Sequence, residues 1–413
     1  MSFINQLYEK RHLFIWINPI KGINRFNIEN NFNSSPNSNL SFLLSKNINI
    51  LPDTVKDAAC SLLGVNLSRP VVSEDINGIN ELIKKKHLRS AANMCQKLIL
   101  NIFENCEKIE DDPNVLFQIL NLYSIRFQIL MGLKEYNILI DEITPFIDLD
   151  IPEFYASFHQ KLKSHELEHC SLVPFSLRLC YAEYLKYSTN PWECIPRINH
   201  LESGVKRVIE FLKTNNEMEP FIEDWNKRLL SVELMKARTL YFLKQTRLSF
   251  EVYSDLLLNM KDENLKKQIL QMLTRLAITI GDEKTMEKFI SELNPQAGAT
   301  QFYLHKCLRA IFNGNYSYAQ EQLQNISRTN DTDPAVANNL AVALLYNGNP
   351  EESVEVIKKF KDLPPEVMFT NITTLSELIL PNSVDEKQAL FSKWVDKLPD
   401  GYNVQEMKIF QPK

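Results

Sequence analysis

The stretch that decides the fold is residues 307–360, which read CLRAIFNGNYSYAQEQLQNISRTNDTDPAVANNLAVALLYNGNPEESVEVIKKF. It contains one pattern twice, because Gly314 and Gly348 are 34 residues apart and similar residues recur at the same offset on either side of them. The matched pairs are Cys307 with Ala341, Ala319 with Ser353, Leu323 with Ile357, and Ile326 with Phe360. The offset predicts a tandem structural repeat.

Each matched pair has a mechanical reason in a hairpin of two antiparallel helices. Cys307 and Ala341 on the first helices, and Ala319 and Ser353 on the second, are small where the two helices cross closely. The glycines fall where the first helix ends, in the left-handed conformation that glycine adopts at little cost. A period of 34 residues built from helical hairpins is that of the tetratricopeptide repeat (TPR).

A residue that favours the end of a helix is followed directly by one that favours the start of the next helix at three places: Gly281-Asp282, Gly314-Asn315 and Gly348-Asn349. The second residue of each dipeptide predicts an N-cap. Proline and glutamate follow in Asn349-Pro350-Glu351-Glu352, and Asn190-Pro191-Trp192-Glu193 repeats that arrangement, which is typical of a capping box.

Composition agrees with helix and excludes several classes of function. The 413 residues are 44% hydrophobic and 23% charged, with only 10 glycines, which is low for a loop-rich enzyme. A net charge of -5 provides no overall basic field, so we expect no nucleic-acid partner. The seven cysteines form no CxxC pair, which is the cytosolic pattern. Neither a signal peptide nor a membrane-inserted segment is expected.

We expect two regions. Residues 1–70 are an Asn-rich, partly disordered arm with short apolar pieces at 13–17, 40–44 and 58–65, one or more of which could dock on the body or on a partner. Residues 71–413 are predicted to be a TPR-like α-solenoid with a C-terminal helical cap. Its clearest repeats are 267–296, 300–333 and 334–366, and weaker hairpins are expected near 228–260, 175–205, 115–146 and 72–102. At the turn position of the weaker hairpins stand Lys86, Thr189 and Lys244 in place of glycine.

The predicted fold class is therefore all-α, with TPR-type antiparallel hairpins stacked into a right-handed solenoid. In such an array the first helix of each hairpin lines a concave surface that can hold a partner peptide or helix. The expected surface positions are Leu304, Leu308, Phe312, Asn338, Val342 and Tyr346. An apolar surface of this kind favours a stable protein contact over the Lys/Arg-rich grooves that bind C-terminal carboxylates of chaperones.

One motif suggests an enzyme. His165-Glu166-Leu167-Glu168-His169 is a literal H-E-x-x-H, which would set two imidazoles on one helix face to bind zinc, with Glu166 as the base. Glu168 places a charge where such motifs carry an uncharged residue, and no third ligand follows at metzincin spacing. A solvated linker is the favoured interpretation, and no cofactor or metal is expected.

A run of lysines, Lys84-Lys85-Lys86, has two interpretations. It could contact phosphates or lipid headgroups. Three lysines at the C-terminal end of a helix also complement the helix dipole, and this is the favoured interpretation.

Four segments resemble the family of subunit 12 of TRAPP, the trafficking protein particle tethering complex. They are Ser171–Arg178 leading into the Asn190-Pro191 hairpin, Val336–Tyr346, Val367–Leu378, and Glu386–Leu390. The last two lie beyond the TPR consensus, so general repeat similarity does not produce them. The resemblance covers about residues 70–410.

The resemblance implies a non-catalytic subunit of the TRAPP III form, working with the subunits numbered eight, eleven and thirteen around a core that activates a Rab GTPase. The implied processes are ER-to-Golgi transport, Golgi organisation and autophagy, with the protein cytoplasmic or peripheral to membranes of the ER-Golgi intermediate and the Golgi. Two alternatives remain: a free TPR adaptor of the co-chaperone type, and a zinc hydrolase using His165 and His169.

Overall fold

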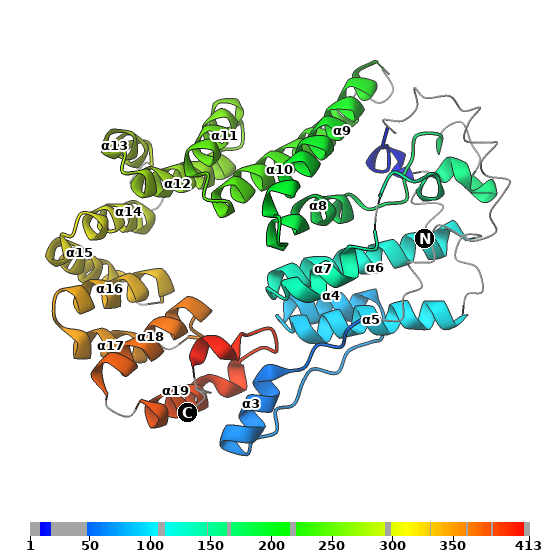
Figure 1. The fold of residues 1–413 in the computed structure, drawn as a ribbon. Coiled ribbons are helices and arrows are strands. Elements are labelled where there is room, and N and C mark those ends of the chain that lie inside the picture. Colours follow the sequence, from blue (N-terminus) through cyan, green and yellow to red (C-terminus); the bar gives the residue numbers. More distant parts are fainter. Residues whose placement is uncertain are drawn as a thin grey trace. The chain divides into compact units, whose positions relative to one another are not determined.

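A computed structural model describes most of the chain (Figure 1). The described residues are 9–17, 48–105, 112–146, 148–162, 167–214, 220–293, 299–330, 332–360, 362–380 and 383–408. Within them the regular structure is helical, and the extended pairings are the isolated bridges between Ile15 and Cys170 and between Tyr155 and Ser171. The all-α fold class is confirmed.

The chain divides into two compact units. The first unit contains residues 1–52 and 72–252, and the second contains residues 53–71 and 253–413. The boundary that the sequence suggested at residue 70 therefore does not coincide with the contacts: residues 48–52 pack in the first unit and the following residues 53–71 in the second.

Helical hairpins form the frame of the first unit. Its main helices, in chain order, are α4 (Ile76–Lys84), α5 (Leu88–Asn105), α6 (Pro113–Gly132), α7 (Tyr136–Ile143), α8 (Phe175–Glu183), α9 (Cys194–Thr214) and α10 (Ile222–Phe242). Short 3-10 turns lie between α7 and α8, at Pro152–Phe154 (η5), Ala156–Phe158 (η6) and Gln160–Leu162 (η7), and between α8 and α9, at Tyr184–Tyr187 (η9) and Pro191–Glu193 (η10). Helix α11 (Thr246–Asn259) crosses from the first unit into the second.

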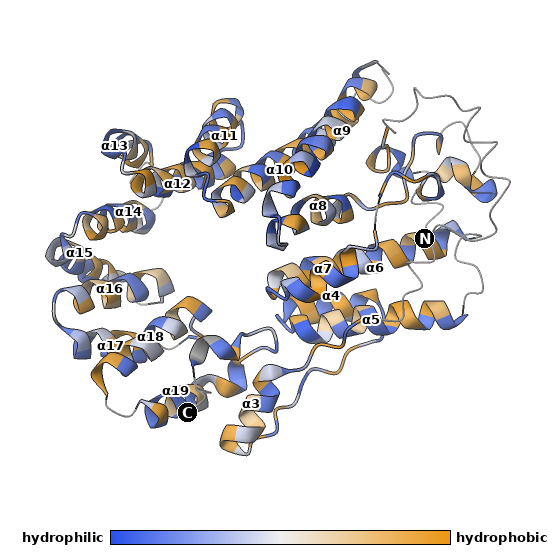
Figure 2. Ribbon diagram, viewed as in Figure 1, coloured by the Kyte–Doolittle hydropathy of each residue, from blue (hydrophilic) through white to orange (hydrophobic). Residues whose placement is uncertain are grey.

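Helix α6 is long and apolar enough to cross a membrane by length and composition, and its hydrophobic colouring is visible in Figure 2. More than half of the apolar window is buried inside the protein, however, at 56%. Leu116, Ile119 and Leu120 are fully covered, and the helix packs on α5, α7 and α8. Its composition is that of the core helix of a helical array.

The second unit is a run of hairpins in which each helix packs on the next. The helices are α12 (Glu263–Ile280), α13 (Glu283–Glu292), α14 (Ala299–Phe312), α15 (Tyr316–Thr329), α16 (Pro334–Tyr346), α17 (Pro350–Lys358), α18 (Glu366–Ile379) and α19 (Val384–Trp394). First helices also touch across repeats, α12 with α14 and α16 with α18. This pattern of contacts is that of a solenoid, in which each repeat buries its apolar face on its neighbours.

An N-terminal helix completes the second unit. Helix α3 (Thr54–Leu63) begins at Asp53, whose side chain accepts a hydrogen bond from the Lys56 amide, and ends at Gly64. Val55, Ala58 and Ala59 are buried in one cluster with the aromatic residues of α18 and α19 and with the 3-10 turns η13 (Val395–Lys397) and η14 (Val404–Met407). The apolar piece at 58–65 therefore docks on the body of the protein.

Candidate partner-binding surface

The glycines that marked the repeat end the first helices of the second unit. Gly281, Gly314 and Gly348 have φ of +82°, +75° and +84°, in the left-handed region. In each turn the amide of the residue after glycine donates to the carbonyl five positions back, as Asn349 does to Leu344 at 2.9 Å. This is the 6→1 bond of a Schellman motif, and it fixes where the second helix starts.

The start of the second helix is capped at two of these three turns. Asp282 accepts from the Thr285 amide at 3.1 Å, and Asn315 from the Tyr318 amide at 3.3 Å. The side chain of Asn349 makes no capping bond, nor does that of Asn190, so the capping boxes expected at those positions are wrong. Proline directly after each asparagine presets the first helical φ.

The small residues lie where the helices of each hairpin cross. Cys307, Ala319, Ala341 and Ser353 are all fully buried. Ser353 Oγ donates to the Ala341 carbonyl at 2.6 Å, so the second helix bonds directly to the backbone of the first. A larger residue at Ala341 would have to displace that contact.

The structure divides the six positions expected to face a partner. Phe312 and Tyr346 are 55% and 62% exposed, whereas Leu308 and Val342 are half-buried. Leu304 is only 4% exposed and packs in the core of the hairpins, so its assignment to the surface is a correction. Leu304 lies one helical turn before Leu308 on the same face of α14, and it packs in one core cluster with Leu323 and Ile326 of α15.

Two contacts organise this surface. The Tyr346 ring stacks on Tyr316, with ring centroids 4.8 Å apart, so an exposed aromatic is held in one orientation. Asn338 Oδ1 accepts from Asn371 Nδ2 at 2.7 Å, which joins α16 to α18. Exposed rings that are already fixed lose little entropy on binding, which suits a protein interface.

The exposed face of α18 is not marked in the sequence. Val367 and Leu378 are each 67% exposed and lie eleven residues, about three helical turns, apart on one face of that helix. Apolar residues fill both faces of α18, so periodicity could not separate the exposed pair from Phe369 and Ile372 in the core.

An extended N-terminal segment docks on the first unit. The Trp16 amide donates to the His169 carbonyl at 2.7 Å, and the Ser171 amide to the Phe14 carbonyl at 2.8 Å. From α10, Trp225 Nε1 donates to the His12 carbonyl at 2.7 Å. The apolar piece at 13–17 therefore docks on the body, while the piece at 40–44 lies outside the described residues.

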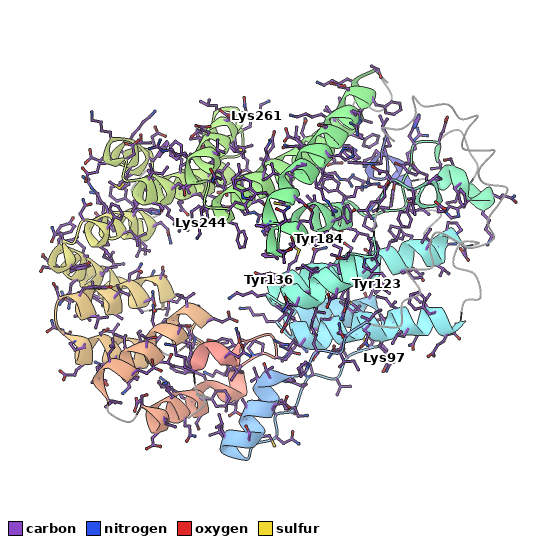
Figure 3. The ribbon with its side chains drawn as sticks, viewed as in Figure 1. Lys97, Tyr123, Tyr136, Tyr184, Lys244 and Lys261 are labelled. Carbon is purple, nitrogen blue, oxygen red and sulfur yellow. The ribbon has the colours of Figure 1, made fainter. Side chains whose placement is uncertain are left out.

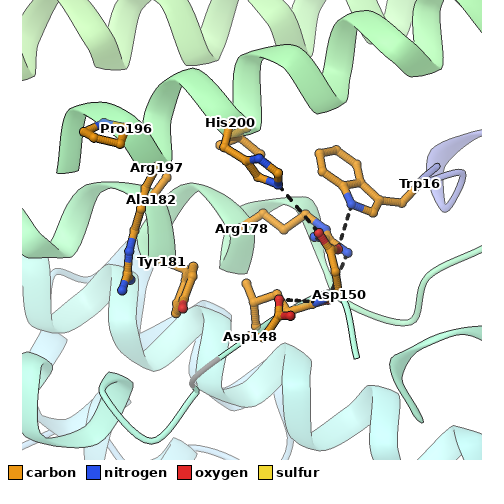
Figure 4. Close-up of a pocket in the computed structure, with 11 residues that line it drawn as sticks. Trp16, Asp148, Asp150, Arg178, Tyr181, Ala182, Pro196, Arg197 and His200 are labelled. Atoms are coloured by element: carbon orange, nitrogen blue, oxygen red, sulfur yellow. Dashed lines mark hydrogen bonds and ion pairs between the residues drawn. The ribbon is translucent and has the colours of Figure 1, made fainter. Parts of the chain in front are cut away.

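Trp16 also forms one wall of a cavity of about 410 Å³ in the first unit (Figure 4). Its indole points toward Asp150, to which Nε1 donates at 2.8 Å, and the Arg178 guanidinium lies 4.1 Å from its ring centroid. Asp150 is also bound by Arg178 Nη1 at 2.8 Å. The buried charges of the cavity thus pair with each other and hold the indole in place.

Side chains of the first unit form hydrogen bonds to the backbone of a second extended segment, residues 48–51. Asn93 bonds both the amide and the carbonyl of Leu51, at 2.8 and 2.9 Å. Gln96 donates to the Ile48 carbonyl at 2.7 Å, and Arg126 to the Asn49 carbonyl at 2.6 Å. Glu142, paired with Arg126 at 2.7 Å, accepts from the Asn49 amide. Helices α5, α6 and α7 therefore bind an extended peptide through its backbone, and that peptide is the chain's own.

Of the H-E-x-x-H motif, His165 and Glu166 lie outside the described residues. His169 is described, and its ring meets Phe211 edge-on with centroids 5.3 Å apart. Within the described ranges no group of three or more His, Cys, Asp or Glu side chains is placed to hold a metal ion. Burial raises the pKa of Cys95, Cys170 and Cys180 to about 12, so these thiols stay protonated.

Comparison with known proteins supports the resemblance noted from the sequence. The chain is 25% identical over 392 residues to trafficking protein particle complex subunit 12 of Mus musculus, covering 87% of this chain and 49% of the relative. To the protein of the same name from Homo sapiens it is 25% identical over 392 residues, covering 87% of this chain and 53% of the relative. The resemblance to the TRAPP subunit 12 family is confirmed.

The chain spans about half the length of the curated relatives it matches. No family model matches its sequence. Among solved structures it is similar to the crystal structure of the APC/C hetero-tetramer Cut9–Hcn1, with a TM-score of 0.31 and 14% identity over 83% of this chain and 74% of that chain.

Proposed function

We propose that this chain is a non-catalytic scaffold subunit of a TRAPP complex of the TRAPP III form. The observation that carries the proposal is the similarity along 87% of the chain to relatives named as subunits of the trafficking protein particle complex. The partners would be the subunits numbered eight, eleven and thirteen together with the core, and Rab activation would belong to that core.

The cellular role follows from that membership. The protein would act in ER-to-Golgi transport, Golgi organisation and autophagy, from the cytoplasm and at the periphery of ER-Golgi intermediate and Golgi membranes. Its contribution would be to hold other subunits in place through protein contacts.

The exposed rings of the second unit support a scaffold. Phe312 and Tyr346 end the first helices of neighbouring repeats, and Val367 and Leu378 extend an apolar face along α18. Aromatic residues carry much of the binding energy at many interfaces. We expect these side chains to contact another subunit.

The test is affinity purification of the tagged chain from its own cells under mild salt, with mass spectrometry of the proteins that co-purify. Near-stoichiometric recovery of other TRAPP subunits is the expected result. Recovery of chaperones in their place would favour the free adaptor, and a zinc-dependent hydrolytic activity lost in Glu166→Gln would favour the enzyme.

A double variant, Phe312→Ala with Tyr346→Ala, tests the surface. It should lower subunit recovery at least about tenfold, because each ring removed from an interface centre costs ~1–2 kcal/mol. Leu258→Ala is the matched control, since Leu258 is 84% exposed and lies on α11. Unchanged recovery with the double variant would remove these two rings from the interface.

A further inference from the structure

Six hairpin turns in the described part of the chain share one backbone geometry, but the key position is glycine in three of them and lysine in the other three. Each turn places one residue at positive φ, with the next amide bonded five positions back. In the second unit that residue is Gly281, Gly314 or Gly348. In the first unit it is Lys86, Lys134 or Lys244, with φ of +62°, +61° and +63°.

Burial shows that the six turns are equivalent. The residue seven positions before each turn and the one five positions after it lie in the core of their hairpin. Around the lysine turns these residues are Ile79 and Ala91, Phe127 and Leu139, and Ala237 and Ser249. Ser249 Oγ even donates to the Ala237 carbonyl at 2.8 Å, as Ser353 does to Ala341.

Lysine is a costly residue for this position. A side chain at positive φ is strained, glycine avoids the strain, and asparagine is the usual second choice. This sequence is rich in asparagine, yet the three hairpin turns with positive φ described in the first unit all carry lysine. Strain kept at equivalent positions points to a use for the side chain. The helix dipole favours a lysine near the C-terminal end of each of these helices, but it does not require the lysine at the residue with positive φ.

The three lysines lie along one edge of the first unit. Arg89 donates to Glu135 at 2.7 Å, which ties the turn at Lys86 to the turn at Lys134. A row of rings ties the next pair: Tyr136 stacks on Tyr187 with centroids 3.7 Å apart, and Tyr187 meets Phe242 at 5.5 Å. Figure 3 labels Tyr136 and Lys244, which belong to this edge.

Three acidic groups on the same edge form ion pairs with neighbouring cations. Glu135 is paired with Arg89, Glu183 with Lys186, and Glu81 with Lys85 at 2.7 Å. Lys86, Lys134 and Lys244 are all exposed. The edge is therefore locally positive although the chain as a whole carries -5.

We propose that this lysine edge, formed by Lys86, Lys134 and Lys244, binds the anionic phospholipid surface of a membrane. Lysine is a compact charge on a flexible stem, which suits headgroups that move in the bilayer plane better than one fixed phosphate. Beside Lys244, Tyr241 and Phe242 are 46% and 47% exposed, and exposed aromatics next to lysines are typical of membrane interfaces. The biological meaning of this contact rests on the proposed tethering role.

The experiment is co-sedimentation of the purified 413-residue chain with vesicles of phosphatidylcholine alone or mixed with phosphatidylserine. The wild type should bind only the mixed vesicles, and added salt should weaken the binding. Lys86→Gly, Lys134→Gly and Lys244→Gly together should lower the affinity by roughly a hundredfold, about fivefold for each lysine. Because glycine relieves the strain, this triple variant should melt no lower than the wild type.

The matched control removes three exposed lysines at the opposite ends of the helices: Lys161→Gln, Lys213→Gln and Lys227→Gln. It changes the net charge equally and should keep most of the binding. Arginine at the three turn positions should restore it. Equal losses in both triple variants, equal binding to phosphatidylcholine alone, or tighter binding to soluble polyglutamate than to the mixed vesicles would overturn the proposal, the last in favour of an acidic protein partner.

The two proposals can fail separately. The lysine edge is tested on the chain alone, whereas the scaffold is tested by the subunits that co-purify with it. Loss of vesicle binding with full subunit recovery in the triple glycine variant is the expected combination. Vesicle binding without any TRAPP subunit in the purification would contradict the scaffold and leave the lysine edge intact.

Discussion

Gly204 of α9 lies where Trp16 of the N-terminal segment packs on that helix. A Cβ at Gly204 of α9 would lie 2.5 Å from Cη2 of Trp16, closer than real carbon atoms approach. The indole cannot easily give way, because Asp150 and Arg178 hold it. Alanine normally stabilises a helix interior relative to glycine, so steric exclusion and helix propensity oppose each other here.

We expect steric exclusion to win, with Gly204→Ala lowering the free energy of unfolding by ~1–3 kcal/mol. Urea unfolding followed by tryptophan fluorescence measures it. In a Trp16→Ala background the same substitution should become neutral or stabilising, since the ring it meets is gone. A cost that persists without Trp16 would show that the close approach is not its cause.

A buried histidine should make the second unit sensitive to acid. His305 on α14 is 1% exposed, and burial is the main cause that lowers its pKa below the ordinary value of 6.5. Unfolding returns the pKa to the ordinary value, so the unfolded chain binds the proton more readily. Stability that is present above about pH 6.5 is then lost as the pH falls through the folded-state pKa.

The measurement is the urea midpoint at roughly pH 7.5 and pH 5.5 for the wild type and for His305→Gln. The wild type should lose more stability on acidification than the variant does. The comparison matters because burial also lowers the pKa of His12, which the variant retains. Equal losses would assign the acid sensitivity to other groups.

At the scale of the element, the turns predict two substitutions with opposite effects on the stability of the fold. Gly348→Lys forces a side chain to a φ of +84° and should cost ~1 kcal/mol, while Lys244→Gly removes that strain and should stabilise by up to ~1 kcal/mol. Thermal melting of the two variants tests both. Shifts of the same sign would mean that the two turns are not equivalent.

The close crossings of paired helices should not accommodate a large side chain. Ala341→Trp places a large ring where α16 meets α17 and should cost at least ~1–3 kcal/mol. Ala335→Trp is the control, because Ala335 is exposed on the same helix. A melting temperature that is unchanged by the first variant would show that the repeat register is wrong.

A hairpin could be predicted from the sequence where its turn contains residues typical of helix ends. The hairpins expected at 267–296, 300–333 and 334–366 correspond to α12–α13, α14–α15 and α16–α17, because glycine followed by a capping residue is a strong local signal. The sequence does not mark Lys134 as a turn, since lysine is ordinary inside helices and only the backbone shows its positive φ.

At the scale of the whole chain, local pattern could not say where the N-terminal segments dock. Trp16 bonds Asp150, and Arg69 bonds the Leu398 carbonyl at 3.0 Å, contacts that span 134 and 329 residues. Periodicity reports which face of a segment is apolar but not which distant surface covers it. The sequence indicated only that the apolar pieces at 13–17 and 58–65 could dock, so the assignment of residues 53–71 to the second unit came from contacts alone.

That assignment predicts which part of the molecule depends on α3. Ala59 is fully buried with Phe369 and Trp394, whereas the next residue, Cys60, is exposed. Arg69 pins the segment by donating to both carboxylate oxygens of Asp53, at 2.6 and 2.9 Å. A carboxylate at position 59 would be buried without a partner and should cost ~3 kcal/mol, whereas one at position 60 would reach water.

Amide hydrogen exchange shows which helices lose stability in the Ala59→Asp variant. In Ala59→Asp the amides of α18 and α19 should exchange faster by about a hundredfold, because their core loses a wall, while the amides of α6 and α9 in the first unit keep their protection. Cys60→Asp should change neither set. If α6 and α9 lost protection together with α18 and α19, the two units would open as one cooperative body, and the second would not be a stability unit of its own.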